Sequence, residues 1–460
     1  MVELNLNEIA KKTGGDILQG LPSISFRTFN IDSRISQPGE LFFALVAQRD
    51  GHTYIADAAQ KGAAGAVISR PITPPNPDMA LIQVPDTLFA LQNLAEKVLD
   101  DHSVKVVGIT GSIGKTTTKE FAATLLARRF EVLKSEGNYN NHIGLPLSIL
   151  RLQRKDEVTV LEMGMRSAGE ITRLTQIAPP DIAVITNIHP VHLEFFHSLE
   201  EIAQAKKEIL DGMKTNGTAV LNGDDPAVQK IARDWRGTKL LFGFSEGCDV
   251  RAENIQRSGY QGITFDFIYG GKRGKATIPF ITTSFLSNFL AASAIAYALS
   301  TPFDDMLAQT QTLKPFPMRG EVFHLPNNIV LIDDSYNSNP AALESILKDL
   351  SQLETNRKVA ILGDMLELGE TQIAYHHEAG EQVQRYAWDL LITIGTLSHH
   401  MAEGALEAGM NRARVASFEN ADQAADHVMS FLEPGDLVLV KGSRGIRTDK
   451  IVESLKNRSN

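Results

Sequence analysis

The sequence predicts a protein of three α/β domains. Short apolar stretches alternate with helical patterns along most of the 460 residues, which is typical of strand–helix–strand units. A chain of this length has room for two or three domains, each with its own core. The pattern changes near residue 103 and again beside Pro315 and Pro317, so the expected domains are 1–102, 103–313 and 314–460.

The expected elements follow this division. In the first segment, strands are predicted at 41–45, 65–68 and 79–84, with helices at 54–61 and 87–99 and a proline-rich loop at 71–77. In the second segment, strands are predicted at 104–109, 132–134, 158–162, 182–186 and 218–221, with a helix at 286–299. Residues 250–281 have a shorter period with a turn at Gly270-Gly271, which indicates an antiparallel addition to this sheet.

The third segment returns to the strand–helix rhythm, with strands predicted at 329–332, 359–362, 390–394 and 437–440. This order resembles a dinucleotide-binding, Rossmann-like domain, but the segment has no GxGxxG motif. The sequence therefore gives no support for a nucleotide site that belongs to the third segment alone.

Composition excludes several classes of protein. Apolar residues make up 43% and charged residues 22%, as in an ordinary globular protein. The net charge of −10, without a basic run, argues against a nucleic-acid partner. Cys248 is the only cysteine, which fits a reducing cytoplasm, and the longest helical apolar run, 289–299, is too short to span a bilayer. A monomer that acts on small molecules in the cytoplasm is expected.

The run from Gly108 to Lys119 is the strongest chemical signal. A strand, a glycine-rich turn and a helix that starts with Lys and Thr are the layout of a triphosphate-binding loop. Ile109 stands where the usual GxxxxGK[ST] motif has its first glycine, so this loop is a TGxxGKT variant. The expected ATP-binding residues of the loop are Thr110, Gly111, Ser112, Gly114, Lys115, Thr116 and Thr117.

Two neighbouring strands carry candidate metal ligands at their ends. Glu162 ends a buried strand and is placed to reach a phosphate-bound metal. His189, His192 and His197 follow the next strand, where they indicate either a zinc site or a single histidine on a second Mg²⁺. Spacing alone does not choose between His189 and His192.

Lys206 lies in the middle of the apolar stripe of a helix predicted over 199–213. A lysine on an inward face is costly unless it is neutral, paired or chemically modified. The alternative is a side chain whose stem packs while its amine reaches water. The pattern does not decide between these interpretations.

Several polar segments are candidates for ligand contacts. The asparagine-rich loop 137–144 can bind phosphate or sugar, or can be a turn. Asn288 lies among alanines on a helix, and Arg319 follows the proline boundary, where an arginine can clamp a phosphate. The polar loops 333–340, 363–369 and 441–444 end three strands of one sheet and together predict a binding face.

Together these residues resemble the Mur ligase family over the whole chain, and within it the MurF branch. The resemblance to this branch rests on five motifs: Asp-Ser-Arg at 32–34, Gly-Asn-Tyr-Asn-Asn at 137–141, DDSYNxNP at 333–340, GDMxELG at 363–369 and LVKGSR at 439–444. The Asp-Asn-Pro-Arg motif of the branch that adds the third residue is not found. The resemblance implies a ligase that adds D-alanyl-D-alanine to UDP-N-acetylmuramoyl-tripeptide through an acyl phosphate. Other amide ligases of this fold, such as folylpolyglutamate synthetase, and a nucleotide-switched scaffold are the alternatives.

The resemblance also implies residue roles. Lys115, Lys206 and His192 are expected to be catalytic; two Mg²⁺ ions are held by Thr116, Glu162, His192 and Lys206, the last as a CO₂-derived carbamate. Asn288 is expected to contact adenine, with Arg319 and Asp334 on the rest of the nucleotide. Substrate contacts are expected from Ser33, Arg34, Asn140, Asn141, Tyr336 and Asn339. The chain departs from the family's usual His-Asn pair by carrying Ser284 and Phe285, which suggests that adenine packs differently, against Phe285.

Overall fold

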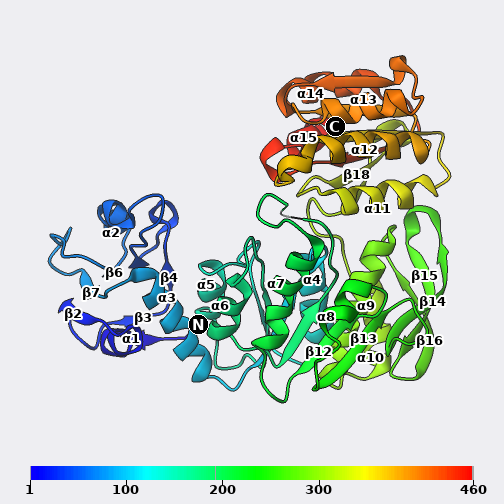
Figure 1. The fold of residues 1–460 in the computed structure, drawn as a ribbon. Coiled ribbons are helices and arrows are strands. Elements are labelled where there is room, and N and C mark those ends of the chain that lie inside the picture. The colour runs from blue at the N-terminus through cyan, green and yellow to red at the C-terminus, as the bar shows by residue number, and fades with distance from the viewer. Residues whose placement is uncertain (1, 192, 458–460) are drawn as a thin grey trace.

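The computed structural model describes residues 2–191 and 193–457. It contains three larger sheets, each flanked by helices, which form the three bodies visible in Figure 1. The N-terminal body, in blue, lies to one side, and the C-terminal body, in yellow to red, lies above the central one. The expected α/β class is confirmed.

The N-terminal body contains a five-stranded sheet in the order β2-β7-β6-β5-β4. Its strands are β2 (Asp16–Gln19), β4 (Phe29–Asn30), β5 (Leu41–Phe43), β6 (Gly65–Ile68) and β7 (Ala80–Gln83). β1 (Leu4–Asn5) and β3 (Ser25–Phe26) form a separate pair, and the helices are α1 (Leu6–Thr13), α2 (Ile55–Gln60) and α3 (Thr87–Asp100). The predicted strands β5 to β7 are confirmed as the parallel centre of this sheet.

The central sheet has nine strands in the order β16-β15-β14-β13-β12-β11-β8-β10-β9. The strands are β8 (Lys105–Thr110), β9 (Val132–Lys134), β10 (Val158–Glu162), β11 (Ile182–Ile185), β12 (Thr218–Asn222), β13 (Thr238–Gly243), β14 (Val250–Arg257), β15 (Ile263–Tyr269) and β16 (Lys272–Ile278). Strands from β9 to β14 run parallel, and β15 and β16 continue the sheet antiparallel. The predicted antiparallel addition is therefore confirmed.

The central helices are α4 (Lys115–Leu126), α5 (Gly144–Ile149), α6 (Glu170–Ile177), α7 (Leu199–Asp211), α8 (Pro226–Ile231), α9 (Thr283–Ala298) and α10 (Phe303–Gln309). In the parallel part of the sheet, β8 lies between β10 and β11 and pairs with both, so the loops that follow these three strands lie at the same edge. This edge of a parallel sheet is where α/β proteins bind ligands.

The C-terminal sheet has the order β17-β18-β22-β19-β20-β21, with only β17 antiparallel to its neighbour. The strands are β17 (Glu321–His324), β18 (Val330–Asp334), β19 (Arg357–Gly363), β20 (Leu390–Ile394), β21 (Val415–Phe418) and β22 (Asp436–Lys441). The helices are α11 (Pro340–Ser351), α12 (Gln372–Arg385), α13 (His399–Glu407), α14 (Ala421–His427) and α15 (Asp449–Asn457).

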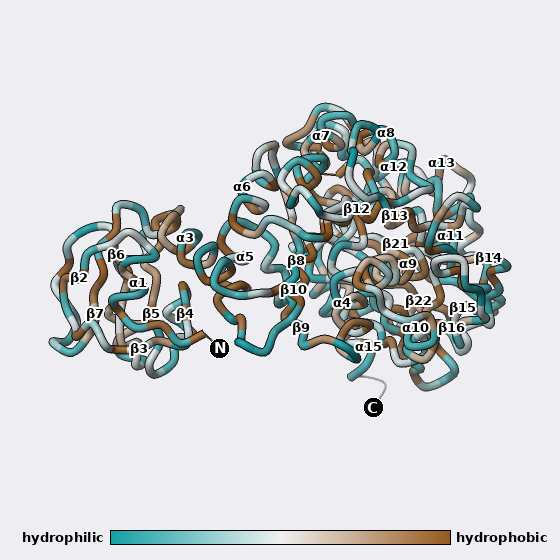
Figure 2. The backbone as a smooth tube through the Cα atoms, turned by 90° about the horizontal axis from the view of Figure 1, so that it is seen from below, coloured by the Kyte–Doolittle hydropathy of each residue, from teal (hydrophilic) through white to brown (hydrophobic). Residues whose placement is uncertain are grey.

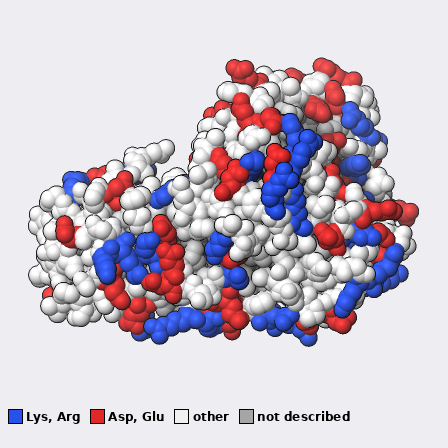
Figure 3. Space-filling model, turned by 60° about the horizontal axis from the view of Figure 1, so that its bottom comes forward, with Lys and Arg blue, Asp and Glu red and all other residues white. Residues whose placement is uncertain are grey.

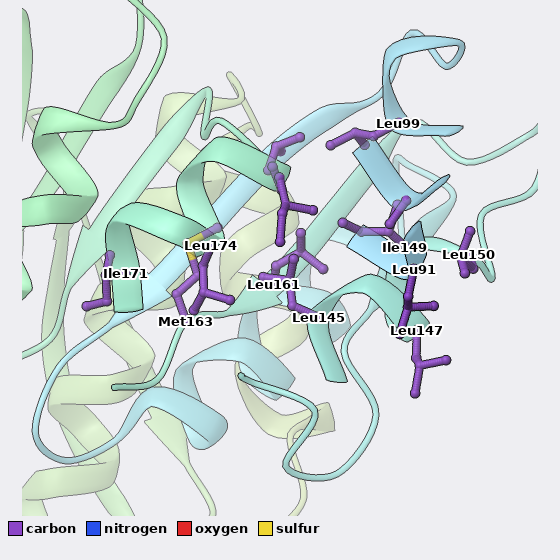
Figure 4. Packing of buried hydrophobic residues seen from close by; sticks show 14 of the residues in the cluster. Leu91, Leu99, Leu145, Leu147, Ile149, Leu150, Leu161, Met163, Ile171 and Leu174 are labelled. Carbon is purple, nitrogen blue, oxygen red and sulfur yellow. The ribbon is translucent and has the colours of Figure 1, made fainter. Parts of the chain in front are cut away.

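The first two bodies share one hydrophobic core. Leu91 of α3 packs in the same cluster as Leu145 of α5, Leu161 of β10 and Leu174 of α6 (Figure 4). Because apolar packing continues from one body into the other, this junction is fixed by burial rather than by surface contacts. Figure 2 shows the hydrophobic stretches inside the bodies and the hydrophilic ones outside.

The C-terminal body has two cores, one of which also includes Ile281 of the central body, and a polar contact joins the two bodies as well. Asp349 of α11 is 5% exposed, and its Oδ2 accepts hydrogen bonds from the backbone N–H and the hydroxyl of Thr283, at 2.7 and 2.8 Å. Its Oδ1 pairs with Arg257 of β14. A carboxylate of the C-terminal body thus caps α9, the helix that carries Asn288.

Basic and acidic side chains are intermixed on the face of the molecule that Figure 3 shows. Among residues 2–191 and 193–457, no helix is long and apolar enough to cross a membrane.

Candidate active site

Two glycines give the loop between β8 and α4 its shape. Gly114 has φ +84°, and a Cβ there would lie 2.1 Å from Oδ1 of Asn288. Gly111 has φ +149°, and its Cβ would lie 1.8 Å from Oγ1 of Thr186. Larger residues are excluded at both positions by contact as well as by backbone conformation. Gly114 also begins α4 without a side-chain cap, so the first N–H groups of the helix are free to bind an anion.

The segment that follows β11 holds this loop in place. The Ser112 N–H donates to the carbonyl of Asn187 at 3.0 Å, and the Ile113 N–H donates to Oδ1 of Asn187 at 2.8 Å. The hydroxyl of Thr186 donates to the carbonyl of Ile113 at 2.7 Å. Ile109, which replaces the usual first glycine, is a fully buried residue of β8, so the turn begins later than in the usual motif.

Lys115 lies inside the loop that it follows. Its Nζ donates to the carbonyls of Gly111 and Ser112 at 2.7 and 3.3 Å. Burial lowers the pKa of Lys115, with Glu162 opposing the shift and Arg319 adding to it. A phosphate in the loop would replace the two carbonyl contacts with an ionic one.

Thr116 and Glu162 are brought together as the sequence predicts. The Thr116 hydroxyl donates to Oε2 of Glu162 at 2.8 Å, and Nδ2 of Asn140 donates to Oε1 at 2.8 Å. Glu162 is 3% exposed and has no cationic partner within ion-pair distance among the described residues. A hydroxyl and a buried carboxylate beside a phosphate-binding loop are oxygen ligands of the kind that Mg²⁺ prefers.

Lys119 is a site residue that sequence reasoning missed. Its side chain is fully buried, and Nζ donates to the carbonyls of Ser135 and Gly137 at 2.7 and 3.2 Å. The hydroxyl of Ser135 in turn accepts from the N–H of Glu162 at 3.2 Å. Lys119 therefore ties the loop after β9 to α4 and fixes the backbone that carries Glu162. Its place four residues after Lys115, on the same helix face, was the available signal.

Lys206 is buried, so the interpretation of an amine that reaches water is wrong. The residue is 2% exposed, and within the described part of the chain its Nζ has no hydrogen-bond or ion-pair partner. Burial, with a further contribution from Lys115, lowers the pKa of Lys206 well below its usual value. An unpaired amine beside Lys115 is biased toward the neutral form, which is the form that reacts with CO₂.

The three histidines have different surroundings. His192 lies outside the described residues. His189 is partly buried. Burial lowers the pKa of its imidazole, and the charge of Asp225 opposes this shift. The backbone N–H of His189 donates to Oγ of Ser112 at 2.8 Å. His197 is exposed. Within 2–191 and 193–457, no group of three or more His, Cys, Asp or Glu side chains is placed to hold a metal, so the zinc interpretation has no support there.

Residues of the C-terminal body reach this edge of the central sheet. Nη2 of Arg319 donates to the Thr116 hydroxyl at 3.3 Å, and its guanidinium lies 4.0 Å from the ring centroid of Tyr336. Asp334 pairs with the buried Lys441 at 2.5 Å. Arg319 and Tyr336 are thus brought to the phosphate-binding loop. Asp334 precedes Tyr336 by two residues in the sequence.

Asn288 and Phe285 share α9 but differ in access. Asn288 contacts Gly114, and its Oδ1 lies 3.4 Å from the Thr118 hydroxyl. Phe285 is 7% exposed and stacks on Phe280 with ring centroids 4.9 Å apart. The expectation that adenine packs against Phe285 is therefore wrong in this structure, because the ring is already covered.

The remaining predicted residues lie in three places. Thr110 and Thr117 are buried, and Oγ1 of Thr110 is unpaired within the described residues. Asn141 and Asn339 accept backbone N–H bonds in a turn and at the start of α11, as the turn interpretation of such residues predicts. Ser33 is buried, and Arg34 is exposed and paired with Asp32; both residues belong to the N-terminal body (Figure 1).

The fold and the site define a class: a multidomain α/β protein whose central parallel sheet carries a triphosphate-binding loop. Comparison with known proteins narrows it. Residues 109–296 match the Mur ligase middle domain, and residues 318–444 match the Mur ligase glutamate ligase domain. A UDP-N-acetylmuramoyl-tripeptide–D-alanyl-D-alanine ligase of Bacillus subtilis (strain 168) is 35% identical over 92% of this chain and 92% of its own. The chain belongs to the Mur ligase family.

Solved structures agree with this assignment. A crystal structure of MurF from Acinetobacter baumannii superposes with a TM-score of 0.91 at 26% identity, covering 99% of both chains. MurF ligase from Thermotoga maritima in complex with ADP has a TM-score of 0.82 at 30% identity, covering 94% of this chain and 98% of its own.

Proposed function

We propose that this protein is an ATP-dependent ligase that joins D-alanyl-D-alanine to UDP-N-acetylmuramoyl-tripeptide, giving the UDP-pentapeptide used for peptidoglycan. The observation that carries the proposal is the similarity to a ligase of this name over 92% of both chains. The convergence of Lys115, Thr116, Glu162 and Lys206 at one sheet edge supports an intact catalytic site. This convergence disfavours a nucleotide-switched scaffold.

ATP is proposed to bind with its phosphates at the uncapped start of α4. The loop residues from Thr110 to Thr117 surround them, and Lys115 neutralises charge on the transferred phosphate. Asn288 and Asp334 are proposed to contact the rest of the nucleotide. The related Thermotoga maritima ligase was solved in complex with ADP, which supports nucleotide binding by this chain.

The residues present fit Mg²⁺. Thr116 and Glu162 would hold one ion, and His192 with a carbamate on Lys206 would share a second with Glu162. When bound, the ions neutralise the charge that develops on the phosphate oxygens. Carbamate formation joins the neutral amine of Lys206 to the carbon of CO₂ and releases one proton, which replaces a buried neutral amine with an anion.

The reaction is proposed to pass through an acyl phosphate. The terminal carboxylate of the tripeptide attacks the γ-phosphorus of ATP, and ADP leaves. The amine of D-alanyl-D-alanine then attacks the acyl carbon, phosphate leaves, and the amine loses a proton. Arg319, already 3.3 Å from Thr116, would stabilise the transferred group, and the C-terminal body would exclude water from the intermediate.

The three bodies are proposed to divide the substrates. Residues 1–102, with Ser33 and Arg34, would hold the UDP-sugar end, and residues 103–313 would hold ATP and the reacting carboxylate. Residues 314–460 would close over them and present D-alanyl-D-alanine, with Asn140, Asn141, Tyr336 and Asn339 as further substrate contacts. The net charge and the single cysteine are consistent with a cytoplasmic monomer.

Phosphate release from ATP and Mg²⁺ tests the proposal. Release is expected only when UDP-N-acetylmuramoyl-tripeptide and D-alanyl-D-alanine are both present. Release with a folate and glutamate instead would favour the folylpolyglutamate alternative. No release with either a diaminopimelate or a lysine tripeptide would contradict the assigned substrate.

A further inference from the structure

Arg173 lies at the junction between the N-terminal and central bodies. It is on α6, and the adjoining residues Ile171 and Leu174 pack into the core shared by the two bodies (Figure 4). This packing fixes the helix, so the base of the Arg173 side chain has a defined position. The side chain itself is partly exposed.

The guanidinium of Arg173 is held by neutral groups only. Nε and Nη2 both donate to Oε1 of Gln92, at 2.8 and 2.6 Å, and Nη1 donates to Oε1 of Gln176 at 3.2 Å. Its centre lies 5.3 Å from the ring centroid of Phe89. Among the described residues, no carboxylate lies within ion-pair distance of it.

Gln92 makes this arrangement rigid. The residue is 5% exposed, and its Nε2 donates to the carbonyl of His142 at 2.9 Å. Both ends of the amide are therefore used, one by Arg173 and the other by the loop that follows Gly137. Phe89, in contrast, is 54% exposed, so the arginine is oriented against an aromatic face that is open to solvent.

The same loop connects Arg173 to the reaction centre. Two residues before His142, Asn140 donates to Glu162 at 2.8 Å. A substrate whose UDP end lies in the N-terminal body and whose reacting carboxylate lies near Lys115 must cross this junction with its peptide. Arg173 presents unused N–H donors and an uncompensated charge at that crossing.

We propose that Arg173 binds a carboxylate of the substrate's peptide other than the one that reacts. This inference rests on the proposed function. Arg173 acts by binding, since it is separated from the phosphate-binding loop by the Gln92 and His142 contacts. A guanidinium that is oriented before the substrate arrives loses little freedom on binding, which favours affinity.

The test compares wild type with Arg173→Gln and Arg173→Lys. Both variants lose the paired bonds to Gln92, but only Arg173→Lys keeps the charge. We expect Arg173→Gln to raise KM for UDP-N-acetylmuramoyl-tripeptide about tenfold or more, with kcat and KM for ATP changed less than about twofold. Arg173→Lys is expected to lie closer to wild type, and the difference between the two variants to shrink at high salt.

Arg154→Gln is the matched control, because Arg154 is an exposed arginine near the opposite, amino-terminal end of β10. It is expected to keep wild-type KM values. Equal KM values for Arg173→Gln and Arg173→Lys, both raised, would show a structural role for Arg173 and overturn the proposal. An unchanged KM in Arg173→Gln would overturn it as well.

Calorimetry without ATP shows which anion of the substrate Arg173 binds, the UDP diphosphate or a peptide carboxylate. It also distinguishes a failure of this inference from a failure of the proposed function. UDP alone should bind wild type and Arg173→Gln equally, and a matching loss for UDP would place Arg173 at the diphosphate and contradict the proposal. A loss confined to the diaminopimelate tripeptide would identify its side-chain carboxylate, and an equal loss with the lysine tripeptide would identify a carboxylate that both share. If wild type binds the tripeptide without turnover, the proposed function fails while Arg173 can still be assessed.

Discussion

Thr116 and Glu162 lie 46 residues apart in the sequence, yet the hydroxyl of one donates to the carboxylate of the other at 2.8 Å. The contact exists because β8 and β10 are neighbours in the central sheet, so the helix that follows β8 and the end of β10 meet at one edge. Asn140 occupies the second carboxylate oxygen. This pair is the core of the proposed metal site.

Glu162→Gln should preserve the fold and lose the charge that a metal needs. We expect kcat to fall by roughly 10²-fold or more, because transition-state charge would be less well neutralised. The Mg²⁺ concentration for half-maximal rate should rise as well. The measurement is turnover against Mg²⁺, with the exposed Glu131→Gln as control. Wild-type Mg²⁺ dependence in Glu162→Gln would remove Glu162 from the metal site.

Lys206→Met tests the buried amine. Because the methionine side chain suits an apolar site and leaves no amine to desolvate, the variant should be inactive but at least as resistant to heat as wild type at pH 7. Carbon-13 NMR with labelled bicarbonate should show a protein carbamate signal in wild type that is missing in the variant. A wild-type level of activity in Lys206→Met would contradict the proposed role.

Arg319→Ala should separate turnover from affinity. Arg319 reaches the Thr116 hydroxyl from the C-terminal body, so its loss should affect the closed, reacting state more than the binding of ATP. We expect kcat to fall by about tenfold or more, with KM for ATP changed less than about threefold. Steady-state kinetics with ATP varied is the measurement, and an unchanged kcat would refute the assignment.

His376 predicts how stability responds to acid. It is fully buried, Nε2 accepts from the Met365 N–H at 2.9 Å, and Nδ1 donates to the carbonyl of Gln372 at 2.6 Å. Burial lowers the pKa of His376, so between the unfolded value near 6.5 and the lower folded value the unfolded chain binds more protons. Stability should therefore fall as pH drops below about 6.5.

Urea unfolding at pH values between 7.5 and 5 checks the predicted fall in stability. The signal that is monitored should report on the C-terminal body, which contains His376. The loss of stability should be smaller in His376→Asn than in wild type, whereas the exposed His399→Gln should keep the wild-type loss. Parallel pH profiles for wild type and His376→Asn would contradict the assignment of the acid response to His376.

The sequence predicts those parts of the fold and site that depend on local pattern. The parallel strands β8, β10, β11 and β12 follow from apolar runs, and the phosphate-binding loop follows from its glycines. Short edge strands such as β2 and β4 have little apolar signal and are defined by their partners in the sheet. Helical spacing places Lys206 on the apolar stripe of α7, but only the structure shows that its amine is buried.

Contacts between distant segments cannot be predicted in this way. The hydrogen bonds of Asp349 to Thr283 and of Arg173 to Gln92 join residues 66 and 81 positions apart, and the bond of Lys119 to Ser135 joins α4 to the segment after the next strand. The covered ring of Phe285 depends on Phe280 and the neighbouring aromatic side chains, which no local motif relates to it. Tertiary packing decides all four.

Oxygen transfer tests the central claim most directly. UDP-N-acetylmuramoyl-tripeptide labelled with ¹⁸O in its terminal carboxylate is incubated with ATP, Mg²⁺ and D-alanyl-D-alanine, and the phosphate and peptide products are analysed by mass spectrometry. An acyl phosphate route predicts a pentapeptide product and phosphate that carries one ¹⁸O, because the attacking carboxylate oxygen leaves with the phosphorus. Unlabelled phosphate, or release of phosphate without pentapeptide, would contradict the account.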